Sequence, residues 1–481
     1  MVFSSYLFLF YFLPLVLLLY YAGPRRARHL TLTLLSYVFY GWANPLFVIL
    51  LFVSTAIDYL AGLAIARSNA AAPLAVGADA ARPRGARIAL MVSLCSNLAL
   101  LGFFKYFIFA AENFDRLADW AGLSGDHFGF ALKVTLPLGI SFYTFQSMSY
   151  TIDVYRGRAA AIRNFTDFAC FVSMFPQLVA GPIIRFSEVA DQLMSRTHTT
   201  TKFARGVAFF SLGLAKKVLV ANPCGKIADL AFEAGGLGVL DAWYGVTAYA
   251  FQIYFDFSGY SDMAIGLGLM FGFMFAKNFD SPYRSQSITE FWHRWHISLS
   301  TWLRDYLYVP LGGNRKGATR TYVNLFIVML LGGLWHGAAW NFVIWGGLHG
   351  VLLAGERLRG KAALYGTLPA PLRVAVTFVL VLFTWVFFRA ADLPHAVGYI
   401  GDMLALRDAP QAAGLLGGVI YQPYYLGTFL LAASIVWTAP QTWDWTRTLT
   451  LPKAAAALAL LLLSAAVLTT QAYNPFIYFI F

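Results

Sequence analysis

Long apolar segments recur along this chain, and many of them have the length of a helix that crosses a membrane. One covers residues 2–21, and two others, over residues 243–275 and 322–354, exceed the ~20 residues needed to span a bilayer. Hydrophobic residues make up 59% of the 481 residues and charged residues only 12%, against about 25% charged residues in a typical soluble domain. The segments are continuous and do not alternate with polar residues as the strands of a membrane β-barrel do. We therefore predict an all-α polytopic membrane protein with roughly ten to twelve transmembrane helices.

The charged residues indicate how the chain is oriented. The 35 Lys and Arg residues outnumber the 23 Asp and Glu residues, which gives a formal net charge of +12. Basic residues of membrane proteins collect in cytoplasmic loops, so we attribute this charge to topology and predict no nucleic-acid partner. Arg25, Arg26 and Arg28 follow the first apolar segment and place that loop in the cytoplasm. No basic residue precedes the segment and no small-residue cleavage site follows it, so we interpret it as a retained span rather than a signal peptide.

Two stretches depart from the pattern of simple spans. Residues 30–66 are long enough for two helices, and the glycine and proline in residues 41–45 predict a break between them. Residues 165–184 carry two prolines and a glycine within an apolar run, with arginines on both sides. A backbone interrupted in this way is tolerated at membrane depth only where it is buried in protein or lines a cavity. We predict that residues 165–184 form a re-entrant segment, and that residues 68–86, rich in Ala, Pro and Gly, form a loop.

Histidine is the most informative residue type in this chain. His29, His127, His198 and His395 lie in or beside polar loops, where we expect them to be solvated. His336 lies instead within an apolar segment and has glycines on both sides, which allow a ligand or another helix to approach closely. An ionisable side chain inside a membrane is costly and marks a candidate functional site. Because a neutral imidazole can accept a proton near neutral pH, His336 is a candidate general base. The alternative is a histidine that is hydrogen-bonded between packed helices.

Residues 288–306 show an amphipathic pattern when they are placed on one helix. Aromatic and leucine side chains fill one arc at ~100° per residue, and His293, His296, Ser300 and Arg304 fall on an adjoining stripe. Such a helix lies at the membrane interface or lines a polar cavity. The two histidines have no further His or Cys nearby and do not match the His-Glu-x-x-His pattern, so we predict no metal site.

Two carboxylates, Asp256 and Asp262, lie within an apolar segment. Carboxylates in such surroundings are expected to be paired or to face a cavity. The candidate partners are Arg284, Arg294 and Arg304. No phosphate-binding loop of the Gly-x-x-x-x-Gly-Lys-[Ser/Thr] type occurs, so the sequence gives no support to ATP-driven transport.

Several short motifs follow one another in a fixed order along nearly the whole chain. They are MVFSS at residues 1–5, FPQLVAGP at 175–182, NFDSPYRS at 278–285, RWHISLS at 294–300, RDYLYVPLGGN at 304–314 and WHG at 335–337. This ordered set resembles the membrane-bound O-acyltransferase (MBOAT) family, and within it the bacterial alginate O-acetyltransferase type. One departure is His293, where that type is expected to carry a basic residue.

The resemblance implies a fold and a reaction. The transmembrane helices, with re-entrant and amphipathic helices beside them, are expected to form a ring around a central funnel. His336 is implied to be the catalytic histidine, acting as general base on a hydroxyl that takes an acetyl group from a thioester, a contribution worth ~10²–10⁴ in rate. His296 is implied to be a second active-site polar residue, which either positions the acyl carbonyl or handles the second proton.

The remaining assignments also follow from the resemblance. We assign substrate-binding roles to Ser300, Arg304, Asp305, Trp335 and Asn341. We place the catalytic core at residues 288–350 within a single MBOAT domain over residues 1–481. We expect no bound cofactor, with acetyl-CoA or another acetyl thioester as the donor substrate. The implied location is the bacterial inner membrane, and the implied partners are a separate periplasmic acetyltransferase protein, an exported polysaccharide and membrane lipid.

Alternative functions remain open at this point. The leading hypothesis is acetylation of an exported polysaccharide such as alginate or cellulose. The same chemistry on peptidoglycan is a close rival, whereas the motif set disfavours D-alanyl transfer to teichoic acid. From a different class comes a non-enzymatic proton-coupled transporter, in which the buried histidines and aspartates relay protons.

Overall fold

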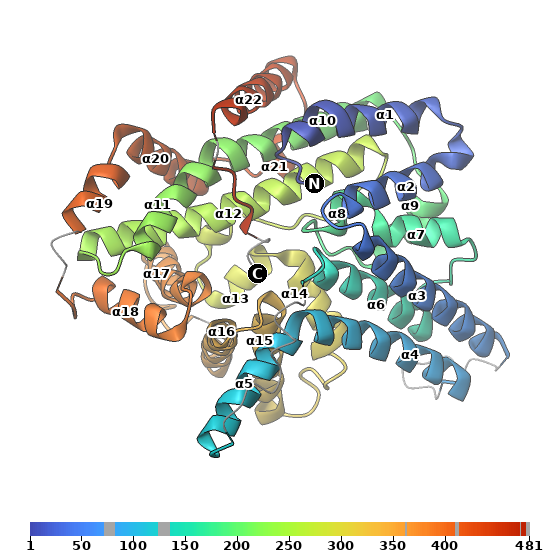
Figure 1. The fold of residues 1–481 in the computed structure, drawn as a ribbon, viewed down its shortest axis with the longest axis horizontal. Helices are drawn as coiled ribbons and strands as arrows, with labels where there is room; N and C mark the ends of the chain where they lie inside the picture. The colour runs from blue at the N-terminus through green and yellow to red at the C-terminus, as the bar shows by residue number, and fades with distance from the viewer. Residues whose placement is uncertain (72–81, 124–134, 361–362, 409–412, 472, 478–481) are drawn as a thin grey trace. The chain divides into compact units, whose positions relative to one another are not determined.

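A computed structural model of the chain describes residues 1–71, 82–123, 135–360, 363–408, 413–471 and 473–477. Within these residues every regular element is a helix, which confirms the predicted all-α class (Figure 1). The described chain forms two compact units, one made of residues 1–199 and 271–275 and the other of residues 200–270 and 276–481. The single domain over residues 1–481 stays a prediction. Of the loop predicted at residues 68–86, residues 72–81 lie outside the described residues, and the prediction was wrong at both ends, since residues 68–71 and 84–86 belong to the flanking helices.

The first unit contains short helices that are joined into longer apolar stretches. In chain order they are η1 (Leu7–Phe12), α1 (Leu13–Ala22), η2 (Arg25–Ala27), α2 (Arg28–Gly41), α3 (Leu46–Ala71), α4 (Arg84–Leu101), η3 (Gly102–Tyr106), α5 (Phe107–Trp120), α6 (Ile140–Arg156), α7 (Phe165–Ser173), α8 (Phe175–Leu178) and α9 (Phe186–Met194). The predicted break at residues 41–45 is confirmed between α2 and α3. The predicted interruption within residues 165–184 falls at Met174, between α7 and α8, and both helices are largely buried. The re-entrant path of this segment stays a prediction.

Two histidines that we expected to be solvated are partly buried in the first unit. The Nδ1 atom of His29 lies 2.6 Å from a carboxylate oxygen of Asp167, and its Nε2 atom contacts the guanidinium of Arg196. The Nε2 atom of His198 lies 2.8 Å from the hydroxyl of Tyr20. The prediction was wrong for both histidines because their polar loops pack against residues distant in sequence. His127 lies outside the described residues.

The second unit is built around the long buried helix α12. Its elements are α10 (Thr200–Ala215), η5 (Lys216–Ala221), α11 (Asn222–Glu233), α12 (Val239–Met270), η6 (Pro282–Arg284), α13 (Ile288–Arg294), α14 (Ile297–Leu303), η7 (Arg304–Tyr308), α15 (Ala318–His336), α16 (Trp340–Leu358), α17 (Ala370–Arg389), α18 (Leu393–Met403), α19 (Ala413–Ile420), α20 (Pro423–Thr438), α21 (Thr442–Trp445) and α22 (Leu451–Thr470). Helices α10 and α11 lie alongside α12 (Figure 1). Nearly every side chain of α12 from residue 242 onward is buried, because the helix is apolar on all sides.

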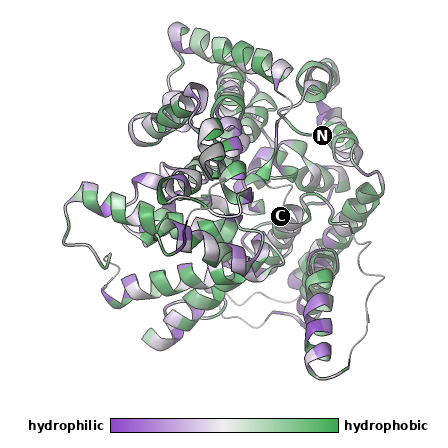
Figure 2. Cartoon of the chain, turned by 60° about the vertical axis from the view of Figure 1, so that its left-hand side comes forward, coloured by the Kyte–Doolittle hydropathy of each residue, from purple (hydrophilic) through white to green (hydrophobic). Residues whose placement is uncertain are grey.

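Five helices in the described part of the chain are long and apolar enough to cross a membrane. They are Leu46–Ala71, Arg84–Trp120, Ala318–His336, Ala370–Arg389 and Leu451–Thr470. Hydrophobic residues are frequent along the helices (Figure 2). These lengths and compositions agree with the predicted class of α-helical membrane protein.

The two carboxylates of α12 are paired, but with lysines of η5 rather than with the arginines that we predicted. Asp256 lies 2.7 Å from the Nζ atom of Lys217, and both side chains are almost completely buried. Asp262 lies 2.6 Å from the Nζ atom of Lys216. Asp256 also accepts the backbone N–H of Ile477, and Lys217 donates to the carbonyl of Pro475. The buried pair therefore fastens the C-terminal segment to the core of the second unit.

We expect the replacement of Asp256 by alanine to lower the free energy of unfolding by about 3–5 kcal/mol, because it leaves the ammonium of Lys217 buried without its carboxylate. Thermal unfolding of the purified protein in detergent measures this loss. Asp444→Ala is the control, since Asp444 pairs with Lys277 at the surface and such a pair is worth about 0–1 kcal/mol. Equal shifts of the unfolding temperature for the two variants would contradict the assigned importance of the buried pair.

Candidate active site

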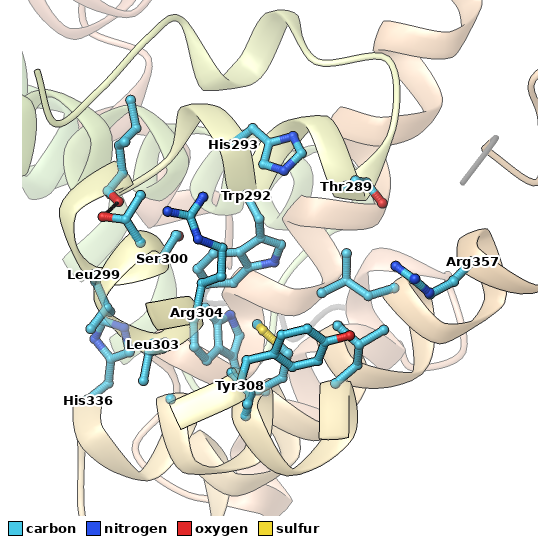
Figure 3. Close-up of a pocket in the computed structure, with 18 of the residues that line it drawn as sticks. Thr289, Trp292, His293, Leu299, Ser300, Leu303, Arg304, Tyr308, His336 and Arg357 are labelled. Carbon is cyan, nitrogen blue, oxygen red and sulfur yellow. Dashed lines mark hydrogen bonds between the residues drawn. The ribbon is translucent and has the colours of Figure 1, made fainter. Parts of the chain in front are cut away.

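A pocket of about 340 Å³ lies in the second unit and is lined mainly by apolar side chains. Its walls come from α13, α14, η7, α15 and α16, so it falls within the predicted core segment of residues 288–350 and slightly beyond it. The polar and charged side chains on its walls include His293, Ser300, Arg304, Tyr308, His336 and Arg357. Figure 3 shows His336 at one side of the pocket and Arg357 at the other. An apolar pocket with a few convergent polar groups is the usual form of a small-molecule site.

His336 is the last residue of α15 and lines this pocket. Its side chain is 5% exposed, and the rings of Trp335, Trp345 and Phe388 lie 5.0–5.2 Å from it, measured between centroids. The pocket therefore presents an imidazole that aromatic rings enclose. Such surroundings limit the access of water and strengthen hydrogen bonds that the imidazole makes to a bound reactant.

The glycines beside His336 allow α15 and α16 to approach closely. A Cβ atom on Gly333 would lie 2.1 Å from the carbonyl oxygen of Phe342, and one on Gly346 would lie 2.3 Å from that of Met329. Because neither contact is sterically allowed, both positions require a residue without a side chain. Of the two predicted roles of the glycines near His336, approach of a ligand or of another helix, this packing confirms the second for Gly333.

The continuous helix that we predicted over residues 288–306 is wrong. Helix α13 ends at Arg294 and α14 begins at Ile297, with His296 between them in the left-handed conformation at φ = +42°. The break is made by a distant segment of the chain. The N–H of Asp280 donates to the carbonyl of Arg294, and the N–H of Ile297 donates to the carbonyl of Asn278, each at 2.9 Å. These two bonds replace helical ones and turn α14 away from α13.

The break separates His296 from the other members of its predicted stripe. His293, Ser300 and Arg304 line the pocket, whereas His296 is completely buried and is not part of the pocket wall. The His296 ring packs edge-on against Phe257, 4.6 Å between centroids, and lies 6.1 Å from Trp335. Burial lowers the pKa of His296 to about 3. Its imidazole is therefore neutral at the pH of a cell.

The other predicted substrate-binding residues divide into two groups. Ser300 and Arg304 lie on the pocket wall, and Asp305 accepts a 2.8 Å hydrogen bond from the Nε atom of Arg304. Trp335 and Asn341 are buried next to the pocket and do not line it. The side-chain amide of Asn341 donates to the carbonyl of Ala390 at 2.7 Å, which fastens the start of α16 to the end of α17. The pocket thus gathers His336, Ser300 and Arg304, whereas Trp335 and Asn341 are buried outside its wall.

Several residues of the site were missed from the sequence. Arg357 and Tyr308 line the pocket, and Asn278 contacts His296 with its Oδ1 atom 3.3 Å from Nδ1. Asn278 belongs to the motif at residues 278–285, and that membership was the available signal. Arg357 follows an apolar segment, where a basic residue is expected for topological reasons alone.

This arrangement can support proton transfer next to a bound anionic or acyl-bearing molecule. His336 provides an imidazole that can take a proton from a hydroxyl group. Arg304 and Arg357 provide guanidinium groups, which bind carboxylates and phosphates through paired hydrogen bonds. Within the described residues, no group of three or more His, Cys, Asp or Glu side chains is placed to hold a metal ion.

Comparisons with known proteins agree with the motifs. The profile of the membrane-bound O-acyltransferase (MBOAT) family matches residues 158–388. A protein of Pseudomonas putida named probable alginate O-acetylase AlgI is 45% identical over the full length of both chains. The protein of that name from Pseudomonas aeruginosa is 50% identical over 82% of this chain and 73% of its own length. A peptidoglycan O-acetyltransferase of Helicobacter pylori is 38% identical over 85% of this chain and 80% of its own length. On this evidence the chain belongs to the membrane-bound O-acyltransferase family.

Proposed function

We propose that this enzyme O-acetylates an exported polysaccharide, with alginate as the substrate that the comparisons favour. The observation that carries the proposal is the 45% identity to the probable alginate O-acetylase of Pseudomonas putida, which extends over both chains completely. The peptidoglycan O-acetyltransferase of Helicobacter pylori is 38% identical over a smaller share of the chain. Peptidoglycan is therefore the second candidate substrate.

The proposed reaction places His336 as the general base. Its imidazole removes the proton of an attacking hydroxyl, whose oxygen forms a bond to the carbonyl carbon of an acetyl thioester. The C–S bond then breaks, and the thiolate receives the proton that the imidazole took up. Arg304 and Ser300 line the same pocket as His336, so we assign them to binding the substrates. Asp305 acts with Arg304, to which it is hydrogen-bonded, and His296 acts as the second polar residue of the site. Direct substrate binding by Trp335 and Asn341 has less support, because neither lines the pocket.

The setting of this reaction is also part of the proposal. We place the enzyme in the bacterial inner membrane, with roughly ten to twelve crossings around a central funnel. Acetyl-CoA or another acetyl thioester delivers the acetyl group from the cytoplasmic side. A separate periplasmic acetyltransferase protein completes its delivery to the polysaccharide. The five long apolar helices support the membrane location.

The O-acetyl content of each secreted and envelope glycan tests the proposal. Three strains are compared: the wild type, a deletion strain, and a strain with His336→Ala whose membrane expression is confirmed. We expect alginate to lose its acetyl groups equally in the deletion and His336→Ala strains, while polymer export continues. Loss from peptidoglycan instead would identify the second candidate substrate. Loss of export with normal acetylation of the remaining polymer would overturn the enzyme assignment in favour of a transporter.

A further inference from the structure

Within the described residues, the buried imidazole of His296 has a hydrogen-bond partner at one ring nitrogen and none at the other. Its Nδ1 atom lies 3.3 Å from the Oδ1 atom of Asn278. Its Nε2 atom is buried and has no hydrogen-bond partner in the described part of the chain. Most buried polar atoms in proteins are hydrogen-bonded, so this nitrogen calls for an explanation. The Nε2 atom of His349 also has no partner in that part of the chain, but there the N–H of Trp292 faces Nδ1, whereas at His296 an amide oxygen faces Nδ1.

The orientation of the Asn278 amide is fixed by groups other than His296. Its Oδ1 atom accepts the backbone N–H of Ser298 at 3.2 Å and the hydroxyl of Ser298 at 2.9 Å. Its Nδ2 atom donates to the hydroxyl oxygen of Ser261 at 2.9 Å. A backbone N–H can only donate, so the amide atom that faces it must be the carbonyl oxygen. The two ends of the Asn278 amide are therefore distinguished by their partners and not by assumption.

The amide of Asn278 decides which nitrogen of His296 carries the hydrogen. The hydroxyl oxygen of Ser298 also lies 3.4 Å from Nδ1, and its hydrogen is donated to the Oδ1 atom of Asn278 at 2.9 Å. Because both groups present an acceptor to Nδ1, the hydrogen of the neutral ring is held on Nδ1 and the lone pair is on Nε2. We propose that Asn278 is a positioning residue that holds His296 in this tautomer, so that Nε2 is a hydrogen-bond acceptor. The part of this inference that assigns His296 to the active site rests on the proposed function. The assignment of the tautomer rests on the geometry alone.

The backbone around His296 supports the same arrangement. Asn278 accepts the N–H of Ile297 with its main-chain carbonyl, in addition to the bonds made by its side chain. A single residue thereby contacts three consecutive residues, from 296 to 298. His296 adopts a left-handed backbone conformation, which persists only where the surrounding structure enforces it and which is common at active sites.

The assigned tautomer separates the two roles that the sequence left open for His296. A nitrogen with a lone pair accepts the proton of an O–H or S–H group and cannot donate to a carbonyl oxygen. His296 therefore accepts a hydrogen bond from the group that carries the second proton and does not position the acyl carbonyl. Trp335 neighbours both imidazoles, with its ring centroid 6.1 Å from that of His296 and 5.0 Å from that of His336.

Two substitutions of Asn278 test the proposal in the full-length protein. Asn278→Leu removes the acceptor at similar volume, and we expect the rate of acetyl transfer per folded molecule to fall by about 10–100-fold, as is typical when an orienting partner is lost. Asn278→Asp keeps an oxygen towards Nδ1, and the Ser261 hydroxyl can turn to donate to its other oxygen. We expect the Asp variant to retain most of the wild-type rate at high pH.

The pH profile distinguishes positioning from a merely structural role. A carboxylate at position 278 stabilises the imidazolium form and so raises the pKa of His296. Once His296 is protonated, Nε2 carries a hydrogen and no longer accepts. We therefore expect Asn278→Asp to lose activity as the pH falls through this raised pKa. The wild type lacks this additional loss, because burial keeps its His296 neutral, so the two profiles differ by the titration of His296 alone.

A spectroscopic measurement tests the tautomer without reference to activity. In protein labelled with ¹⁵N-histidine, the chemical shifts of protonated and unprotonated ring nitrogens differ, and a His296→Asn sample assigns the signals. We expect Nδ1 to be protonated and Nε2 unprotonated in the wild type. The control is Asn222→Leu, because Asn222 is a similarly buried asparagine of the same unit whose side chain donates to Tyr473 and Asn474 near the C-terminus. It is expected to lower stability and to leave the tautomer unchanged.

Each outcome decides the proposal. A protonated Nε2 in the wild type would overturn it, as would a wild-type rate in Asn278→Leu or a rate in Asn278→Asp no higher than in Asn278→Leu. If Asn278→Leu does not fold, the wild-type spectrum and the pH profile of Asn278→Asp give the answer. Absence of acetyl transfer by the wild-type protein would overturn the proposed function instead, while the spectrum would still test the tautomer.

Discussion

We expect the replacement of His336 by glutamine to lower the rate of acetyl transfer by a factor of about 10²–10⁴, the usual contribution of a general base. Glutamine reaches about as far as the imidazole and is neutral, so it preserves much of the packing against Trp345 and Phe388. Its amide cannot take up a proton near neutral pH. The loss should therefore appear in the chemical step and leave binding of the thioester nearly unchanged. Single-turnover kinetics of the purified protein separate these two quantities.

The control for this prediction is another buried histidine of the same unit. His349 on α16 is completely buried and accepts a 3.2 Å hydrogen bond from the Nε1–H of Trp292, and it does not line the pocket. His349→Asn places an oxygen where Nδ1 was, so this bond can be kept. We expect its rate to stay within a few-fold of the wild type. Equal losses in the two variants would mean that His336 acts through packing alone.

The sequence was sufficient to predict features that depend on local chemistry. Continuous apolar segments with few charges predicted the helical membrane class. Gly41 and Pro45 predicted the break between α2 and α3, because both residues disfavour a helix interior whatever surrounds them. An ionisable residue in an apolar segment predicted a functional role for His336, and the structure places that residue on a pocket wall.

Features that depend on contacts distant in sequence were not predicted. No glycine or proline occurs within residues 288–306, so nothing local indicated the break at His296. The break depends on hydrogen bonds from residues 278 and 280, whose position follows from the fold. In the same way, the apolar segment around Asp256 and Asp262 indicated that they pair or face a cavity, but the choice of Lys216 and Lys217 as partners depends on the register between η5 and α12.

Of two substitutions of His296, we expect the variant that is more stable to be the less active one. Asparagine adopts the left-handed backbone conformation of this position with less strain than most residues. Its amide can also replace the Nδ1–H bond to Asn278. Glutamine fits this conformation less well, but it extends to the position of Nε2 and offers an acceptor oxygen there. We therefore expect His296→Asn to be the more stable variant, by about 1 kcal/mol, and His296→Gln to be the more active one.

The expected loss of rate follows from the role of the Nε2 atom of His296 as a hydrogen-bond acceptor. Loss of the Nε2 acceptor in His296→Asn should lower the rate about 100-fold, at the lower end of the range for a group that takes part in proton transfer. His296→Gln should retain more of the wild-type rate. Unfolding temperatures and initial rates are measured on the same preparations of the wild type and both variants. If activity instead rises and falls with stability across the three proteins, His296 supports the fold and its Nε2 atom takes no part in the reaction.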